Sequence, residues 1–118
     1  MQREHEEAMR ADFTTYVELG RQMYRPSTSE AEIQVLDMQQ QVVADRWESG
    51  PHAEHWNYLE DAREDWRRAP DTMRRFLENV DHNGGDGLTD IQHRSHEQAR
   101  DITAQDRPRP RSRIERGR

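Results

Sequence analysis

Apolar residues recur every three or four positions through most of the first hundred residues, a spacing that places them on one face of an α-helix. The first such segment covers residues 3–24 and ends before Pro26, because proline cannot continue a helix. The pattern therefore predicts an amphipathic helix over this range. Its apolar face consists of Met9, Phe13, Tyr16, Val17 and Met23.

A second helix is predicted over residues 29–48. Its start is marked by two alternative capping boxes, in which a serine and the glutamate three residues later satisfy free backbone amides. The two pairs are Ser27 with Glu30 and Ser29 with Glu32. A lone helix of this length is marginal in water, so we expect its broad apolar face to pack against the first helix in an antiparallel hairpin. That face consists of Ile33, Leu36, Val43 and Trp47, with Gln40 at the missing position of the seam, and is widened by Val35, Met38 and Val42.

Three shorter helices are predicted in the rest of the chain. One follows Gly50 and Pro51 and covers residues 51–69, a second begins at Pro70, and a weak last helix covers residues 88–104. No run alternates apolar and polar residues as a strand would, so the predicted fold class is all-α, a small helical bundle built on the antiparallel hairpin. The apolar residues at helical spacing are Trp56, Leu59, Ala62 and Trp66, then Met73, Phe76, Leu77 and Val80, then Leu88, Ile91, Ala99 and Ile102.

Charge divides the chain into an acidic body and a basic tail. Residues 1–106 carry 12 arginines against 23 acids, whereas residues 107–118 carry six arginines against Glu115. We therefore predict a helical domain over residues 1–104 and a disordered tail, rich in arginine and proline, over residues 105–118. Leu, Ile, Val and Phe together number 16 of 118 residues. This is a small supply for a core, so we expect the fold to be marginal or assisted by a partner.

The sequence excludes several kinds of chemistry and favours a non-enzymatic protein. No cysteine is present, which rules out disulfides, cysteine-based metal sites and a thiol nucleophile. Phosphate-binding glycine loops and nucleophile motifs are also missing, and no cofactor is expected. Without a long apolar run or a secretory signal at its start, the chain is expected to be cytoplasmic, with no membrane partner. All 18 basic residues are arginine, a bias that suggests a GC-rich genome or a phage or plasmid within one.

One loop carries candidate metal ligands. Between the last two predicted helices, the segment DHNGGDGLTD, residues 81–90, combines acidic and amide side chains with glycines that favour a turn. It resembles the calcium loops of EF-hand, dockerin and thrombospondin type 3 repeats, and the resemblance implies Asp81, Asn83 and Asp86 as ligands. Those loops have one residue fewer before the third ligand and close on a glutamate, which this segment lacks. The alternative is a glycine-rich connection between two helices.

Two further hypotheses concern macromolecular partners. Aromatic residues and methionine are enriched at protein interfaces, so an exposed face with Trp56, Trp66, Met73 and Phe76 is the first candidate for binding a protein partner or for self-association. The alternative is that these residues form the core. The sequence thus favours a small helical interaction or regulatory protein, with a nucleic-acid accessory protein and a calcium-binding helix-loop-helix as alternatives. The candidate nucleic-acid contacts are Arg107, Arg109, Arg111, Arg113, Arg116 and Arg118.

Overall fold

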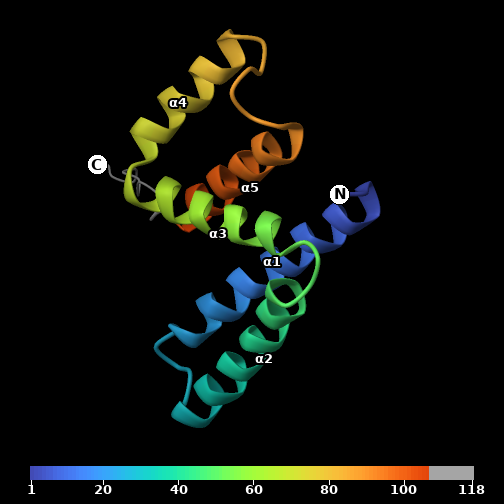
Figure 1. Cartoon of the computed structure of the whole chain (residues 1–118). Coiled ribbons are helices and arrows are strands. Elements are labelled where there is room, and N and C mark those ends of the chain that lie inside the picture. The colour runs from blue at the N-terminus through green and yellow to red at the C-terminus, as the bar shows by residue number, and fades with distance from the viewer. Residues whose placement is uncertain (107–118) are drawn as a thin grey trace, which may run out of the picture. The chain divides into compact units, whose positions relative to one another are not determined.

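A computed structural model describes residues 1–106, and within them the chain forms five α-helices and no strand (Figure 1). The predicted all-α fold class is confirmed, and each helix boundary lies within two residues of the predicted one. No helix in this part of the chain is long and apolar enough to cross a lipid bilayer. The helices are α1 (Arg3–Met23), α2 (Glu30–Glu48), α3 (Ala53–Arg68), α4 (Pro70–His82) and α5 (Asp90–Asp106).

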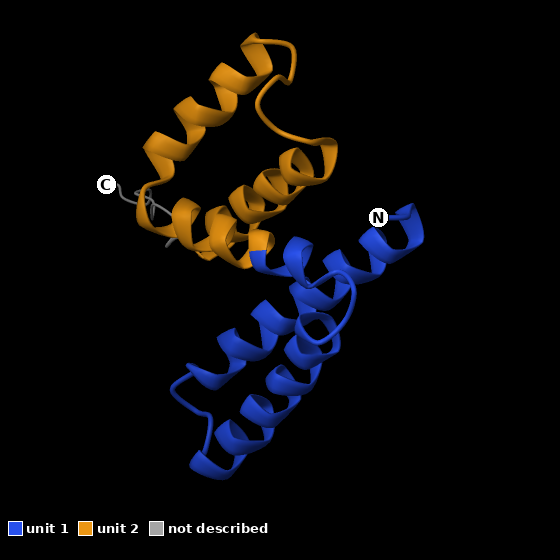
Figure 2. Ribbon diagram, viewed as in Figure 1, with its two compact units in different colours: residues 1–57 blue, residues 58–118 orange. Residues whose placement is uncertain are grey.

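The chain divides into two compact units within α3 (Figure 2). Residues 1–57 form the first unit, which contains α1, α2 and the start of α3, and the chain from residue 58 onward forms the second. No sequence feature predicted this division within residues 1–104. Of the predicted tail, Gln105 and Asp106 belong to α5, and the remaining residues lie outside the described part of the chain.

The first unit contains the predicted antiparallel helical hairpin. Gln40 on α2 donates a hydrogen bond from Nε2 to the backbone carbonyl of Tyr16 on α1, at 2.9 Å. Further along α2, Arg46 forms an ion pair with Asp12, which lies earlier on α1, at 2.7 Å. Residue numbers therefore rise along α2 as they fall along α1, as an antiparallel pair requires. The predicted hairpin is confirmed, with Gln40 in its seam.

Helix α2 begins with the second of the two predicted capping boxes. The Ser29 hydroxyl accepts a hydrogen bond from the Glu32 amide at 3.2 Å, and the Glu32 carboxylate accepts one from the Ser29 amide at 2.8 Å. The hydrogen bond from the Ser29 backbone amide favours the charged carboxylate and lowers the pKa of Glu32, and the Ser29 side chain adds to this shift. The start of α2 is therefore marked by two hydrogen bonds between residues three positions apart.

Aromatic rings form the centre of the first unit. Trp56, which has no exposed surface, packs edge to face on Phe13 with ring centroids 5.2 Å apart and lies nearly parallel to Trp47 at 6.4 Å. The indole N–H of Trp47 donates to the Asp12 carboxylate at 2.7 Å, which joins the aromatic core to the hairpin ion pair. The buried apolar residues of this unit are Met9, Phe13, Val17, Val43, Ala44, Trp47 and Trp56.

The second unit has a smaller core between α3, α4 and α5. Trp66 lies in this core and donates from its indole nitrogen to Nδ1 of His96 on α5, at 3.1 Å. The core cluster comprises Ala62, Trp66, Leu77 and Ala99, with the partly buried Met73 and Leu88 packed against it.

The connection between α4 and α5 is the glycine-rich turn that the sequence predicted. Gly84, Gly85 and Gly87 all have positive φ angles, of 73°, 88° and 107°, which residues with a side chain rarely adopt. The turn ends at a capping box in which Thr89 and Gln92 exchange hydrogen bonds between side chain and backbone amide, at 3.0 and 3.1 Å. The Thr-x-x-Gln spacing is a sequence signal for this helix start.

Candidate interaction surface on helix α2

Helix α2 carries apolar side chains on two opposite sides. Val43 and Trp47 are buried in the hairpin core, on the side that faces α1. On the other side, Val35, Met38 and Val42 are exposed over 56%, 66% and 57% of their surface. Spacings of three and four residues place these three side chains in one line along the helix. We call this line of exposed side chains, Val35, Met38 and Val42, the α2 stripe.

The prediction that Val35, Met38 and Val42 widen the face packed against α1 is wrong. Met38 and Trp47 are nine residues apart, which is about two and a half helical turns, so they point to opposite sides of α2. A helix packed on one neighbour buries only one side, and α1 covers the side that holds Trp47. The sequence contains enough apolar residues for two faces, and the hairpin covers one of them.

The α2 stripe continues into a groove at the tip of the hairpin, with a volume of about 550 Å³. Val35 belongs both to the stripe and to the lining of the groove, and Ala31 extends the apolar lining one helical turn back along α2. The connecting loop is held by the Thr28 hydroxyl, which donates to the backbone carbonyl of Gln22 at 2.6 Å. The complete lining consists of Gln22, Arg25, Ser27, Thr28, Ala31, Glu32, Val35, Leu36 and Gln39.

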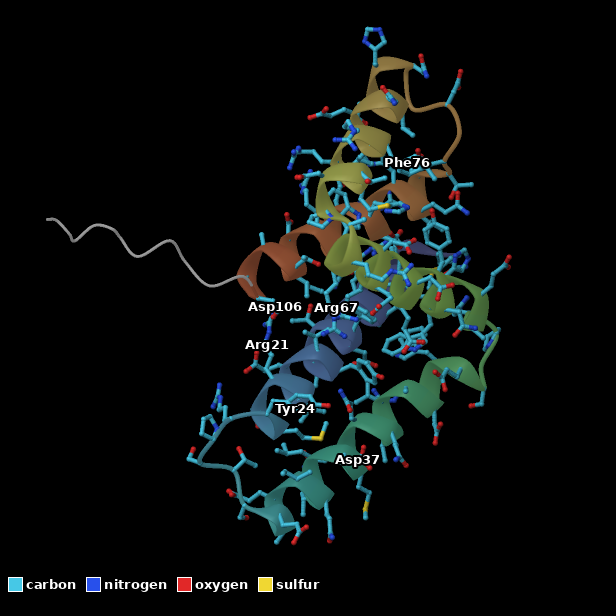
Figure 3. All side chains as sticks on the ribbon, turned by 90° about the vertical axis from the view of Figure 1, so that its left-hand side faces the viewer. Arg21, Tyr24, Asp37, Arg67, Phe76 and Asp106 are labelled. Carbon is cyan, nitrogen blue, oxygen red and sulfur yellow. The ribbon has the colours of Figure 1, made fainter. Side chains whose placement is uncertain are left out.

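One flank of the α2 stripe is acidic. Glu30, Asp37 and Glu48 are separated by seven and eleven residues, about two and three helical turns, so they lie along one line of the helix. All three side chains are exposed, and Asp37 can be located on α2 in Figure 3. Arg46, the one arginine of α2, follows Val42 by one helical turn on the line of the stripe and is paired with Asp12. The surface beside the stripe is therefore negatively charged.

The structure changes the interpretation of the four residues predicted to form an exposed partner face. Trp56 and Trp66 are 0% and 3% exposed, so both tryptophans are core residues and the expected exposed face does not include them. Met73 is partly buried against the core of the second unit. Phe76, labelled on α4 in Figure 3, is 38% exposed, and its ring packs edge to face on His96. A chain with so few aliphatic residues uses its large aromatic side chains to fill the core.

The candidate calcium ligands lie at the end of α4 and in the following turn. Asp81 is in the last turn of α4, and its carboxylate lies 2.6 Å from Nε2 of His93 on α5. This hydrogen bond raises the pKa of His93, and the nearby charge of Glu97 adds to the effect. Within residues 1–106, no group of three or more His, Cys, Asp or Glu side chains is arranged to hold a metal ion. Calcium binding by Asp81, Asn83 and Asp86 stays a prediction, with one of the three carboxylate and amide groups already bound to a histidine.

The six tail arginines proposed as nucleic-acid contacts lie outside the described residues.

Comparison of the chain with models of protein families, with curated protein sequences and with solved structures finds no match. The described residues therefore define the protein as an all-α chain of two compact helical units, with an exposed apolar stripe beside an acidic flank on α2.

Proposed function

We propose that this chain is a non-enzymatic interaction protein that binds an amphipathic helix of a protein partner along the α2 stripe. The observation that carries the proposal is the exposure of Val35, Met38 and Val42, three apolar side chains in line on one helix. When a partner covers a contiguous apolar surface of this kind, the free energy of the system falls, because apolar area is removed from water. An amphipathic helix matches the surface because its own apolar residues recur with the same spacing.

The charge around the stripe favours one kind of partner helix. The carboxylates of Glu30, Asp37 and Glu48 lie along one flank of the stripe, and the chain as a whole carries a formal charge of −6. A helix with arginine or lysine along the matching flank would be attracted to this surface, and an acidic helix would be repelled. A second copy of this chain brings the same acidic flank, so like charges disfavour self-association through α2. We therefore propose a basic amphipathic helix as the occupant.

The groove and the stripe together support a contact of limited length. Ala31 and Val35 line the groove, and the stripe extends from there to Val42. Residues 31–42 of a helix span about 18 Å, or a little over three turns. A partner helix of three to four turns would cover the stripe and place one end in the groove.

Selection from a displayed library of helical peptides tests this proposal on the full chain. The expected winners carry large apolar residues at helical spacing with lysine or arginine on one flank. We expect Met38→Asp to weaken their binding at least tenfold, because it places a charge in the centre of the apolar contact. Ala11→Asp, a matched substitution at an exposed position of α1, should change the affinity less than twofold.

Three results would contradict the proposal. Winners with acidic flanks would show that charge does not select the partner. Equal binding by the Met38→Asp and Ala11→Asp variants would place the contact elsewhere on the chain. A dimer in sedimentation equilibrium that Met38→Asp dissociates would make a second copy of the chain the occupant of the stripe.

A further inference from the structure

His96 of the second unit is buried on α5 between two aromatic residues of α3. It is 4% exposed, and its Nδ1 accepts the hydrogen bond from the Trp66 indole at 3.1 Å. Its other ring nitrogen, Nε2, lies 2.9 Å from the Tyr58 hydroxyl. Tyr58 and Trp66 are eight residues apart, about two helical turns, so both lie on the same face of α3. One imidazole ring therefore connects α5 to two side chains about two turns apart on α3.

The chemistry of Trp66 determines which protonation state of His96 fits. An indole N–H is a donor and has no acceptor capacity, so Nδ1 of His96 must present a lone pair to it. A neutral imidazole with a free Nδ1 carries its proton on Nε2, and that N–H then donates to the Tyr58 oxygen. Both ring nitrogens are satisfied only in this neutral form.

We propose that His96 is an acid-sensitive latch that holds α5 to α3 while its ring is neutral. Protonation at Nδ1 directs an N–H at the N–H of Trp66, so the hydrogen bond is lost and two donors face each other. Trp66 belongs to the core cluster of the second unit, together with Ala62, Leu77 and Ala99. Movement of the indole away from His96 therefore loosens the core of this unit. The latch is separate from the α2 stripe and does not depend on the proposed function.

The groups around His96 act on its titration in both directions. Burial disfavours the imidazolium and lowers the pKa of His96, the Asp65 carboxylate on α3 opposes this shift, and His93 on α5 adds to it. Burial also raises the pKa of the Tyr58 phenol, so that group stays neutral throughout the titration of His96. From α4, His96 is faced by the uncharged ring of Phe76, with centroids 5.5 Å apart. A carboxylate and a second histidine are thus the charged neighbours of the latch.

The direction of the pH dependence follows from linkage. The folded state holds the pKa of His96 below the ordinary value of 6.5. The latch therefore contributes its full stability above about pH 6.5, and this contribution is lost as the pH falls through the lowered pKa of the folded protein. Acid should loosen the second unit before carboxylate protonation unfolds the chain.

Melting temperatures of the full chain at pH 7 and pH 5 test the latch. His96→Gln keeps an amide oxygen that can accept from Trp66 and an amide nitrogen that can donate to Tyr58, but it cannot be protonated. We expect the acid-induced fall in melting temperature to be smaller in this variant than in the wild type by about 4–8 °C. His82→Gln, the same change at an exposed position of α4, should fall as far as the wild type. An equal fall in the His96→Gln variant would overturn the proposal.

A second variant keeps the test decisive if His96→Gln does not fold. Trp66→Phe removes the N–H that faces Nδ1, so protonation of His96 no longer brings two donors together. In nuclear magnetic resonance titrations of the full chain, the pKa of His96 should then rise toward its ordinary value, and in the wild type the Trp66 indole signal should shift with the same midpoint as the His96 ring. An unchanged pKa in the Trp66→Phe variant would mean that the indole does not control the histidine.

Discussion

Gln40 is the polar residue that ties α2 to the backbone of α1. Its side-chain amide donates to the carbonyl of Tyr16 at 2.9 Å. Gly20 lies one helical turn after Tyr16 on α1, and a Cβ atom at Gly20 would come within 3.0 Å of the Gln40 amide nitrogen. The glycine therefore leaves the space that the amide occupies. A helix-interior glycine is unfavourable by about 1 kcal/mol relative to alanine, so the hydrogen bond is formed at some expense in helix stability.

A double-mutant cycle measures this coupling between Gly20 and Gln40. In a Gln40→Ala background, Gly20→Ala is expected to stabilise the chain by about 1 kcal/mol, because only helix propensity changes. In the wild-type background the gain should be clearly smaller, since the new methyl group displaces the Gln40 amide from Tyr16. Urea denaturation of the four variants supplies the free energies of unfolding. Equal gains in both backgrounds would show that the amide moves aside without loss.

At the scale of elements, the helix boundaries were predictable because the signals that set them act over a few residues. Pro70 begins α4, the glycine-rich segment ends it, and a capping box begins α2. The sequence offered two capping boxes for α2, and local pattern alone did not choose between them. The structure forms the box of Ser29 and Glu32.

Alanine substitution distinguishes the two predicted capping boxes. Ser29→Ala removes the hydroxyl that accepts from the Glu32 amide and is expected to lower the free energy of unfolding by about 1 kcal/mol. Ser27→Ala, at the exposed serine of the alternative box, should lie within about 0.5 kcal/mol of the wild type. Thermal and urea unfolding give both values. A larger loss for Ser27→Ala than for Ser29→Ala would mean that the helix begins earlier than the structure shows.

At the scale of the whole molecule, burial could not be predicted from periodicity. Helical spacing identifies apolar residues but does not say which partner covers them, and both α2 and α3 show this. On α2, Val35 and Met38 were expected in the hairpin and are exposed. On α3, the sequence left open whether Trp56 and Trp66 form a partner surface or the core, and both are buried. The hydrogen bond that places Trp66 against His96 joins residues thirty positions apart. Only the packed chain reveals these contacts, because nothing in the local pattern pairs α3 with α5.

The charge of the whole chain leads to a separate prediction for nucleic-acid binding. The six arginines of residues 107–118 are the candidate phosphate contacts, and the rest of the chain is acidic. If all six bind phosphates, the logarithm of the DNA-binding constant should fall with the logarithm of salt concentration with a slope of about −5. Fluorescence anisotropy measures this slope, and replacement of the six arginines by glutamine should abolish binding. Undiminished binding by that variant would exclude the tail as the contact.

Chemical-shift mapping is the most direct test of the proposal that α2 is the interaction surface. A basic amphipathic peptide obtained by selection is titrated into the isotopically labelled full chain, and amide signals are followed in both units. We predict that the largest shifts fall on residues 31–42, around the α2 stripe and the groove, and that the core of the second unit around Trp66 is unaffected. Shifts concentrated on residues 58–106, with α2 unchanged, would contradict the account.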